Sequence, residues 1–213
     1  MIWLLLFLPS CEALWELNDY TVQDVIVAEG FEIIVIDNFF KHLDDIECLR
    51  VEVGLASNNY PGVRYKIFDE PDHPAFSDYM CGLSSFTLPP HELNRMQRIP
   101  HSDGPNDDAI LVYLKDDDND GTAFYRHRGS GSINPDFDNY RSTMKHEASL
   151  TKPEDGYLFG SNDRWEMIYH VKAKRNRALI YDPYYFHSAY INSSWNRTSV
   201  SCFKRHNYSF TFP

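Results

Sequence analysis

The apolar positions along the chain predict a protein built mainly from short β-strands. Phe31 to Asp37 is a run of β-branched and other apolar residues typical of a buried strand. Lys41 to Ala56 instead carries apolar residues at spacings of three and four, which predicts a helix. Asn58 to Pro90 is rich in Pro, Gly, Asn and Asp, so loops and short strands are expected there.

After Pro90 the pattern is strand-like almost to the end, and turn-type residues separate the runs. Many short strands with one early helix favour a double-stranded β-helix, the jelly roll, with a supporting N-terminal helix and strands. The chain is then one domain over residues 1–213, with a support region over 14–94 and a jelly-roll core over 95–213. The expected strands of that core are Arg95–His101, Ala109–Leu114, Thr122–Arg126, Trp165–Val171, Ala178–Tyr181, Tyr185–Tyr190, Thr198–Phe203 and Tyr208–Phe212.

The stretch Gly129 to Gly156 interrupts these runs. It is long, polar and without clear periodicity, so it is predicted to be a loop. Long loops within compact domains are often functional. We therefore hypothesise that this stretch covers a bound substrate.

Candidate chemistry begins with the triplet His101-Ser102-Asp103. Side chains at positions i and i+2 of an extended segment point to the same face, so His101 and Asp103 can converge on one ion. One imidazole and one carboxylate are two of the three ligands in the facial triad of non-haem Fe(II). The triplet alone favours a plain surface turn, because His-x-Asp arises often by chance.

Two later residues complete a pattern. His187 lies in an aromatic, strand-like run, and we expect it to supply a third ligand from a strand on the facing sheet. Arg197 follows ten residues later, where a strand returning from a turn would carry it into the same cavity, deeper than the metal. A buried Arg needs an anion, and a carboxylate matches its planar fork.

The order His-x-Asp, distant His, then Arg resembles the Fe(II)/2-oxoglutarate oxygenase superfamily. Within it, Val112–Lys115 followed by Asp120–Phe124 resembles the prolyl-4-hydroxylase-like branch, in which Tyr-Leu-Asn leads through a turn into Gly-Gly-x-Thr-x-Phe. Asp120 replaces the first of those glycines and Lys115 replaces the Asn. The similarity runs from about Gln97 to Phe203, half of the chain.

The resemblance implies roles for five residues. His101, Asp103 and His187 would bind Fe(II), Arg197 would pair with the distal carboxylate of 2-oxoglutarate, and Tyr113 would place its phenol against the same carboxylate. The implied enzyme hydroxylates a C–H bond of a peptidyl or small-molecule substrate with dioxygen, releasing succinate and CO2, with ascorbate as a candidate reductant. Family members that halogenate lack the carboxylate that Asp103 supplies, so its presence favours hydroxylation.

Other interpretations of the same residues are possible. A cupin-like jelly roll would bind a metal or a sugar without oxidation, although it has no need of a buried Arg197.

His170 is an alternative third ligand, but a half-buried strand histidine is the better interpretation. Arg177 could compete for the carboxylate, although its place at a strand start favours a surface role. Asp116–Gly121 opens like a calcium loop, but its twelfth position is His127, not Glu, and an acidic turn fits better.

Bulk properties narrow the choice of partners. The net charge of −11 argues against a nucleic-acid partner, since such proteins carry a basic face. The four cysteines show no zinc-ligand spacing and are interpreted as buried thiols.

The two ends of the chain leave its location open between the cytoplasm and the secretory pathway. Residues 1–13 form a signal-like apolar segment that lacks a preceding Lys or Arg and is too short to span a bilayer. Three glycosylation sequons, at Asn192, Asn196 and Asn207, lean toward export.

Overall fold

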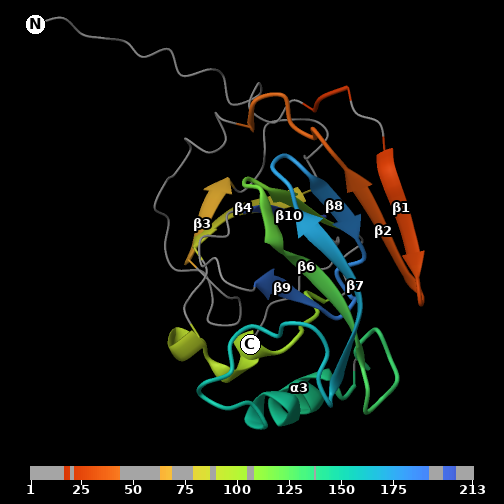
Figure 1. Cartoon of the computed structure of the whole chain (residues 1–213), viewed down its shortest axis with the longest axis vertical. Helices are drawn as coiled ribbons and strands as arrows, with labels where there is room; N and C mark the ends of the chain where they lie inside the picture. The colour runs from red at the N-terminus through yellow and green to blue at the C-terminus, as the bar shows by residue number, and fades with distance from the viewer. Residues whose placement is uncertain are drawn as a thin grey trace, which may run out of the picture.

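The described part of the protein is mainly β and contains two antiparallel sheets with few helices (Figure 1). This confirms the predicted fold class at that level. The computed structural model describes residues 17–19, 22–43, 63–68, 79–86, 90–104, 108–136, 138–191 and 199–204. No helix within those residues is long and apolar enough to cross a membrane.

The larger sheet has seven strands in the order β1-β2-β8-β5-β10-β4-β3, and the smaller sheet has three, in the order β7-β6-β9. The strands of the larger sheet are β1 (Val22–Ala28), β2 (Phe31–Ile36), β3 (Val63–Phe68), β4 (Tyr79–Phe86), β5 (Ala109–Tyr113), β8 (Ala178–Tyr181) and β10 (Ser199–Lys204). Those of the smaller sheet are β6 (Asp117–His127), β7 (Trp165–Ala173) and β9 (His187–Ile191).

The main core lies between the two sheets. Apolar side chains of β1, β2, β5 and β8 pack there against Phe124 of β6 and Val171 of β7. Phe124 is fully buried and meets Phe31 and Tyr181 edge-on, with ring centroids 5.7 Å and 5.2 Å apart. Full burial of such a side chain contributes roughly 1.5–3 kcal/mol, so this layer is a main source of stability.

A second apolar cluster lies on the other face of the smaller sheet. There Tyr125, Trp165 and Phe186 pack against Met144 and Ala148 of helix α3 (Tyr140–Ser149), which runs below this sheet in Figure 1. The helix lies inside the stretch predicted to be a loop, so that prediction was wrong. Besides Met144 and Ala148, the helix buries the charged Glu147, so its core-facing side does not show as an apolar stripe.

The predicted strand Arg95–His101 was also wrong in its first half. Arg95–Arg98 forms a 3₁₀ turn, η3, after a shorter one, η2 (Pro90–Glu92), and the chain is extended from Ile99. Asn94 and Gln97 cap the turn reciprocally: each side chain accepts a hydrogen bond from the other's backbone N–H. Backbone carbonyl oxygens of Leu93 and Lys152 accept from the Arg98 guanidinium at 2.7 Å and 2.9 Å, which holds this turn in place.

Several other strand predictions are confirmed, with small shifts at their ends. They are the runs that became β2, β5, β7, β8, β9 and β10, and the run Thr122–Arg126, which is the centre of the longer β6. The predicted helix from Lys41 to Ala56 lies, after Leu43, outside the described residues, as do Tyr208–Phe212, residues 1–13 and the three sequons.

Candidate metal centre

The three predicted metal ligands are brought together by backbone pairing at one edge of the smaller sheet. His187 begins β9, and His101 lies directly opposite it: each backbone N–H donates to the other's carbonyl oxygen, both at 2.9 Å. The Asp103 backbone is also held in place, because its N–H donates to the carbonyl oxygen of Pro183 at 2.9 Å. The expectation that His187 would come from the facing sheet was therefore wrong, because it pairs beside His101 in one ladder.

The side chains of these residues converge. One ligand atom from each of His101, Asp103 and His187 lies within 4.8 Å of the others. The Asp103 carboxylate is central: Oδ2 lies 3.2 Å from His187 Nε2, and Oδ1 lies 3.6 Å from His101 Nε2. The side chains of Asp103 and His187 are 5% and 6% exposed, whereas that of His101 is 20% exposed, so the centre opens on the His101 side.

The hydrogen bonding of His187 leaves its second ring nitrogen facing the Asp103 carboxylate. Its Nδ1 lies 2.8 Å from the carbonyl oxygen of Tyr185, which can only accept, so Nδ1 carries the hydrogen. In the neutral ring, Nε2 then carries a lone pair, and it faces an Asp103 carboxylate oxygen at 3.2 Å. Two acceptors this close need either a second ring proton or a metal ion between them. The donor set therefore fits a bound metal.

Tyr140 of α3 supports the turn that carries two of the ligands. Its hydroxyl donates to the carbonyl oxygen of Ser102 at 2.9 Å and accepts from the Ser102 N–H at 3.2 Å. Burial is the main cause that raises the pKa of the Tyr140 phenol, and the Asp103 charge adds to it, so the hydroxyl stays a donor at neutral pH. No local pattern in the sequence pointed to Tyr140, which lies in the predicted loop.

Two aromatic rings form an apolar wall beside His187. Phe124, its partner in the β6–β9 ladder, has its ring centroid 6.3 Å from that of the imidazole. The Tyr181 ring lies 5.1 Å from the imidazole, edge-on. Both rings belong to the core between the sheets, so the metal centre borders that core.

Tyr113 reaches across the same core. It is 1% exposed, and its hydroxyl donates to Thr122 Oγ1 at 2.7 Å, which links β5 of the larger sheet to β6 of the smaller one. Thr122 precedes Phe124 by two residues on the same face of β6, about 7 Å along the strand. The Tyr113 hydroxyl therefore lies between the sheets, on the face of β6 that meets His187. Arg197 lies outside the described residues.

The competing candidates have other surroundings. His170 is half-buried, as predicted, and its ring packs 4.0 Å from that of Tyr190, apart from the three-residue cluster. Arg177 binds Asp37, with Nε at 2.7 Å from Oδ1, and this hydrogen bond is the main cause that lowers the pKa of Asp37. The acidic run Asp117–Gly121 lies within strand β6, so it is not flanked by the two helices of an EF-hand.

His127 departs from its prediction. An exposed position was expected, but the residue is 8% exposed and lies between Ser130 and Glu147. No local pattern indicated this burial, because its partner Glu147 comes from a helix that was predicted to be a loop.

The assembled centre offers two imidazoles and one carboxylate, a set that suits a divalent first-row metal such as Fe(II) or Zn(II). Three protein ligands leave further coordination positions for small molecules.

No curated protein matches the chain. Residues 67–200 match the model of a family of unknown function, DUF6445, and this range includes the three ligands, Tyr113 and Arg197. Since the match spans more than half of the chain, the protein belongs to the DUF6445 family.

Proposed function

We propose that this protein is an Fe(II)- and 2-oxoglutarate-dependent dioxygenase that hydroxylates a C–H bond of a peptidyl or small-molecule substrate. The observation that carries the proposal is the convergence of His101, Asp103 and His187 within 4.8 Å. Two histidines and one carboxylate with open positions are the ligand set of many non-haem Fe(II) oxygenases. The resemblance of the surrounding motifs to the prolyl-4-hydroxylase-like branch supports the same choice.

We also propose that the two sheets form a jelly roll, with the metal at one end of the barrel-like core. The apolar layer shared by β2, β5, β8 and β6 supports this arrangement. The position of the ligands supports it as well, since they lie at the edge of the smaller sheet and beside that shared layer.

In this proposal the cosubstrate lies between the sheets. Its keto acid end would bind the metal, and its distal carboxylate would accept hydrogen bonds from Tyr113 and Arg197. Tyr113 is suitably placed, because its hydroxyl is buried beside that of Thr122, and Thr122 would donate to it in the complex and leave the phenol hydrogen for the carboxylate. Ser199, two positions after Arg197 in the chain, pairs with Tyr113 across the β5–β10 ladder, which favours a shared role for the two residues.

Bound iron, together with 2-oxoglutarate and dioxygen, would supply the oxidising power that converts a substrate C–H bond to an alcohol, with release of succinate and CO2. The chain's own residues hold and shield this chemistry. Tyr185 orients His187 through its carbonyl oxygen, and Tyr140 braces the turn between His101 and Asp103. The rings of Phe124 and Tyr181 keep water from the His187 side.

The test is succinate formation from 2-oxoglutarate by the purified full chain with Fe(II) and ascorbate. We expect iron-dependent succinate that is lost in His101→Ala and in Arg197→Ala. His91→Ala is the matched control, because the His91 side chain is 79% exposed and lies outside the cluster. Its rate should equal that of the wild type.

Absence of succinate would be followed by calorimetry with 2-oxoglutarate on the same metal-loaded sample. Binding that Arg197→Ala weakens would keep the proposal and direct the search to a missing substrate. No binding would overturn it in favour of a cupin-like, non-oxidising metal site.

A further inference from the structure

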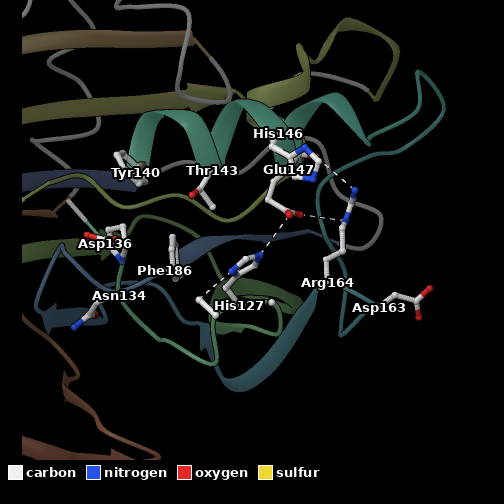
Figure 2. A pocket seen from close by; sticks show the side chains of 13 residues that line it. His127, Asn134, Asp136, Tyr140, Thr143, His146, Glu147, Asp163, Arg164 and Phe186 are labelled. Carbon is white, nitrogen blue, oxygen red and sulfur yellow. Dashed lines mark hydrogen bonds and ion pairs between the residues drawn. The ribbon is translucent and has the colours of Figure 1, made fainter. Parts of the chain in front are cut away.

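A second polar site lies on the other side of the smaller sheet from the core. It is a cavity of about 450 Å³ between helix α3 and the turn that follows β6 (Figure 2). None of the three metal ligands lines it. Its wall includes His127, Ser130, Thr143, His146, Glu147 and Arg164.

Three of these residues form a relay. Ser130 Oγ lies 3.0 Å from His127 Nδ1, and His127 Nε2 lies 3.3 Å from Glu147 Oε1. Figure 2 shows the His127 imidazole pointing toward the Glu147 carboxylate of α3. In a catalytic triad the hydroxyl is the nucleophile, the imidazole is its general base and the carboxylate orients the imidazole. Ser130, His127 and Glu147 supply these three groups in that order.

The hydrogen-bond partners allow the relay to run from Ser130 toward Glu147. The Ser132 N–H donates to Ser130 Oγ at 3.3 Å, so the Ser130 hydroxyl proton is available for His127 Nδ1. In the tautomer that accepts from Ser130, the imidazole carries its hydrogen on Nε2, which faces the Glu147 carboxylate. This is the protonation pattern in which His127 can take the serine proton.

The surroundings hold both partners of Ser130 in place. Glu147 is 5% exposed, and Arg164 Nε lies 3.3 Å from its Oε2, which supplies the opposite charge that a buried carboxylate needs. The His127 ring packs 4.8 Å from that of Trp165. The ring also lies close to Gly129, where an added Cβ would be 3.0 Å from the imidazole Cε1, so a side chain there would press on the ring.

Access differs between the members of the relay. Ser130 is exposed in the turn, whereas His127 and Glu147 are buried. A substrate can therefore reach the hydroxyl from solvent and place its remaining part in the cavity. Thr143 and His146 of α3 also line the cavity and offer hydrogen-bond donors for an oxygen that becomes negative.

We propose that Ser130, His127 and Glu147 form a second, metal-independent active site that transfers the acyl group of a small carboxylic ester to water. Ser130 Oγ bonds to the carbonyl carbon while its proton passes to His127 Nδ1. The bond between carbon and the alcohol oxygen breaks, and His127 returns the proton to the departing alcohol. Water then attacks the acyl-serine with His127 again as base, which releases the carboxylic acid and restores Ser130.

The test uses the full chain and an alkyl fluorophosphonate, which reacts with activated serines, with peptide mass spectrometry to locate the product. We expect modification at Ser130. Ser142 is the internal control, because it is exposed on α3 and its hydroxyl donates to the Asn139 carbonyl oxygen at 2.8 Å, with no histidine partner. Glu147→Gln should slow labelling of Ser130 by about 100-fold, the usual contribution of an intact general-base system.

Hydrolysis of p-nitrophenyl acetate provides a second readout. It should be lost in Ser130→Ala, which removes an exposed hydroxyl, and kept in Ser142→Ala and in the presence of EDTA. EDTA would abolish succinate formation, so failure of the metal centre and failure of this site are distinguishable. Labelling of Ser130 no faster than that of Ser142, or hydrolysis unchanged by Ser130→Ala, would overturn the proposal and leave the network as a clamp for α3.

Discussion

Replacing Tyr113 by Phe removes one hydroxyl group from the core between the two sheets and leaves the ring in place. That hydroxyl donates to Thr122 Oγ1 at 2.7 Å, and the side chain is 1% exposed, so no bulk water takes over its role. If the distal carboxylate of 2-oxoglutarate binds there and accepts the phenol hydrogen in place of Thr122, Tyr113→Phe deletes one of its hydrogen-bond donors.

The size of the effect follows from the charge of the acceptor. A hydrogen bond to a charged group is worth roughly 1.5–3 kcal/mol net, so the dissociation constant for 2-oxoglutarate should rise roughly 10- to 150-fold. A neutral buried hydrogen bond is worth about 1 kcal/mol, which lowers the melting temperature of a chain of this length by roughly 2–4 °C. Affinity for the cosubstrate should therefore change far more than stability.

The assay is calorimetry of 2-oxoglutarate binding to protein loaded with Mn(II), which occupies the metal centre without turnover. Tyr125→Phe is the matched control, because its buried hydroxyl donates to the Leu158 carbonyl oxygen at 3.1 Å on the opposite face of the smaller sheet. It should lose similar stability and keep the wild-type affinity. Equal affinities for the wild type, Tyr113→Phe and Tyr125→Phe would refute the role of Tyr113.

Three further predictions test the support of the site and of the fold. Tyr140→Phe removes the brace on Ser102 and should weaken metal affinity about tenfold, measured by competition with a fluorescent chelator; an unchanged affinity would contradict the brace. At pH values above 3.8, the ordinary pKa of the carboxyl, Asp37→Asn should lower the free energy of unfolding measured in urea, because Arg177 lowers the pKa of Asp37 in the folded protein. Protonation removes this advantage of the wild type as the pH falls through that lowered pKa, and a difference that persists in stronger acid would contradict the ion pair. Gly121→Ala should cost about 3 kcal/mol in denaturant unfolding, because the new methyl would overlap a β7 carbonyl oxygen, and a neutral result would contradict the close β6–β7 contact.

The strands could be predicted where burial follows the local pattern. Every residue of Ala109–Tyr113 is buried, and Ala178–Tyr181 is nearly so, which makes each a continuous apolar run. Helix α3 could not be predicted in this way. It contributes few apolar side chains and buries Glu147, whose partners His127 and Arg164 lie about 20 residues away in either direction.

The metal centre likewise combines a feature that the local sequence predicts with features that it does not. The spacing of His101 and Asp103 was enough to place both side chains on one face, since that depends only on extended backbone. The register that sets His187 opposite His101 joins segments 86 residues apart, and no local pattern specifies it. Tyr140 supports the site through its contact with the Ser102 backbone, an interaction that leaves no mark in the sequence.

All roles proposed for the oxygenase site depend on one metal ion held jointly by His101, Asp103 and His187. The most direct test is anaerobic titration of the metal-free full chain with Fe(II), with bound metal measured after gel filtration. We predict one equivalent per chain for the wild type and for His91→Ala, and almost none for Asp103→Ala or His187→Ala. Stoichiometric binding that survives loss of Asp103 and of His187 would contradict the assignment of this centre.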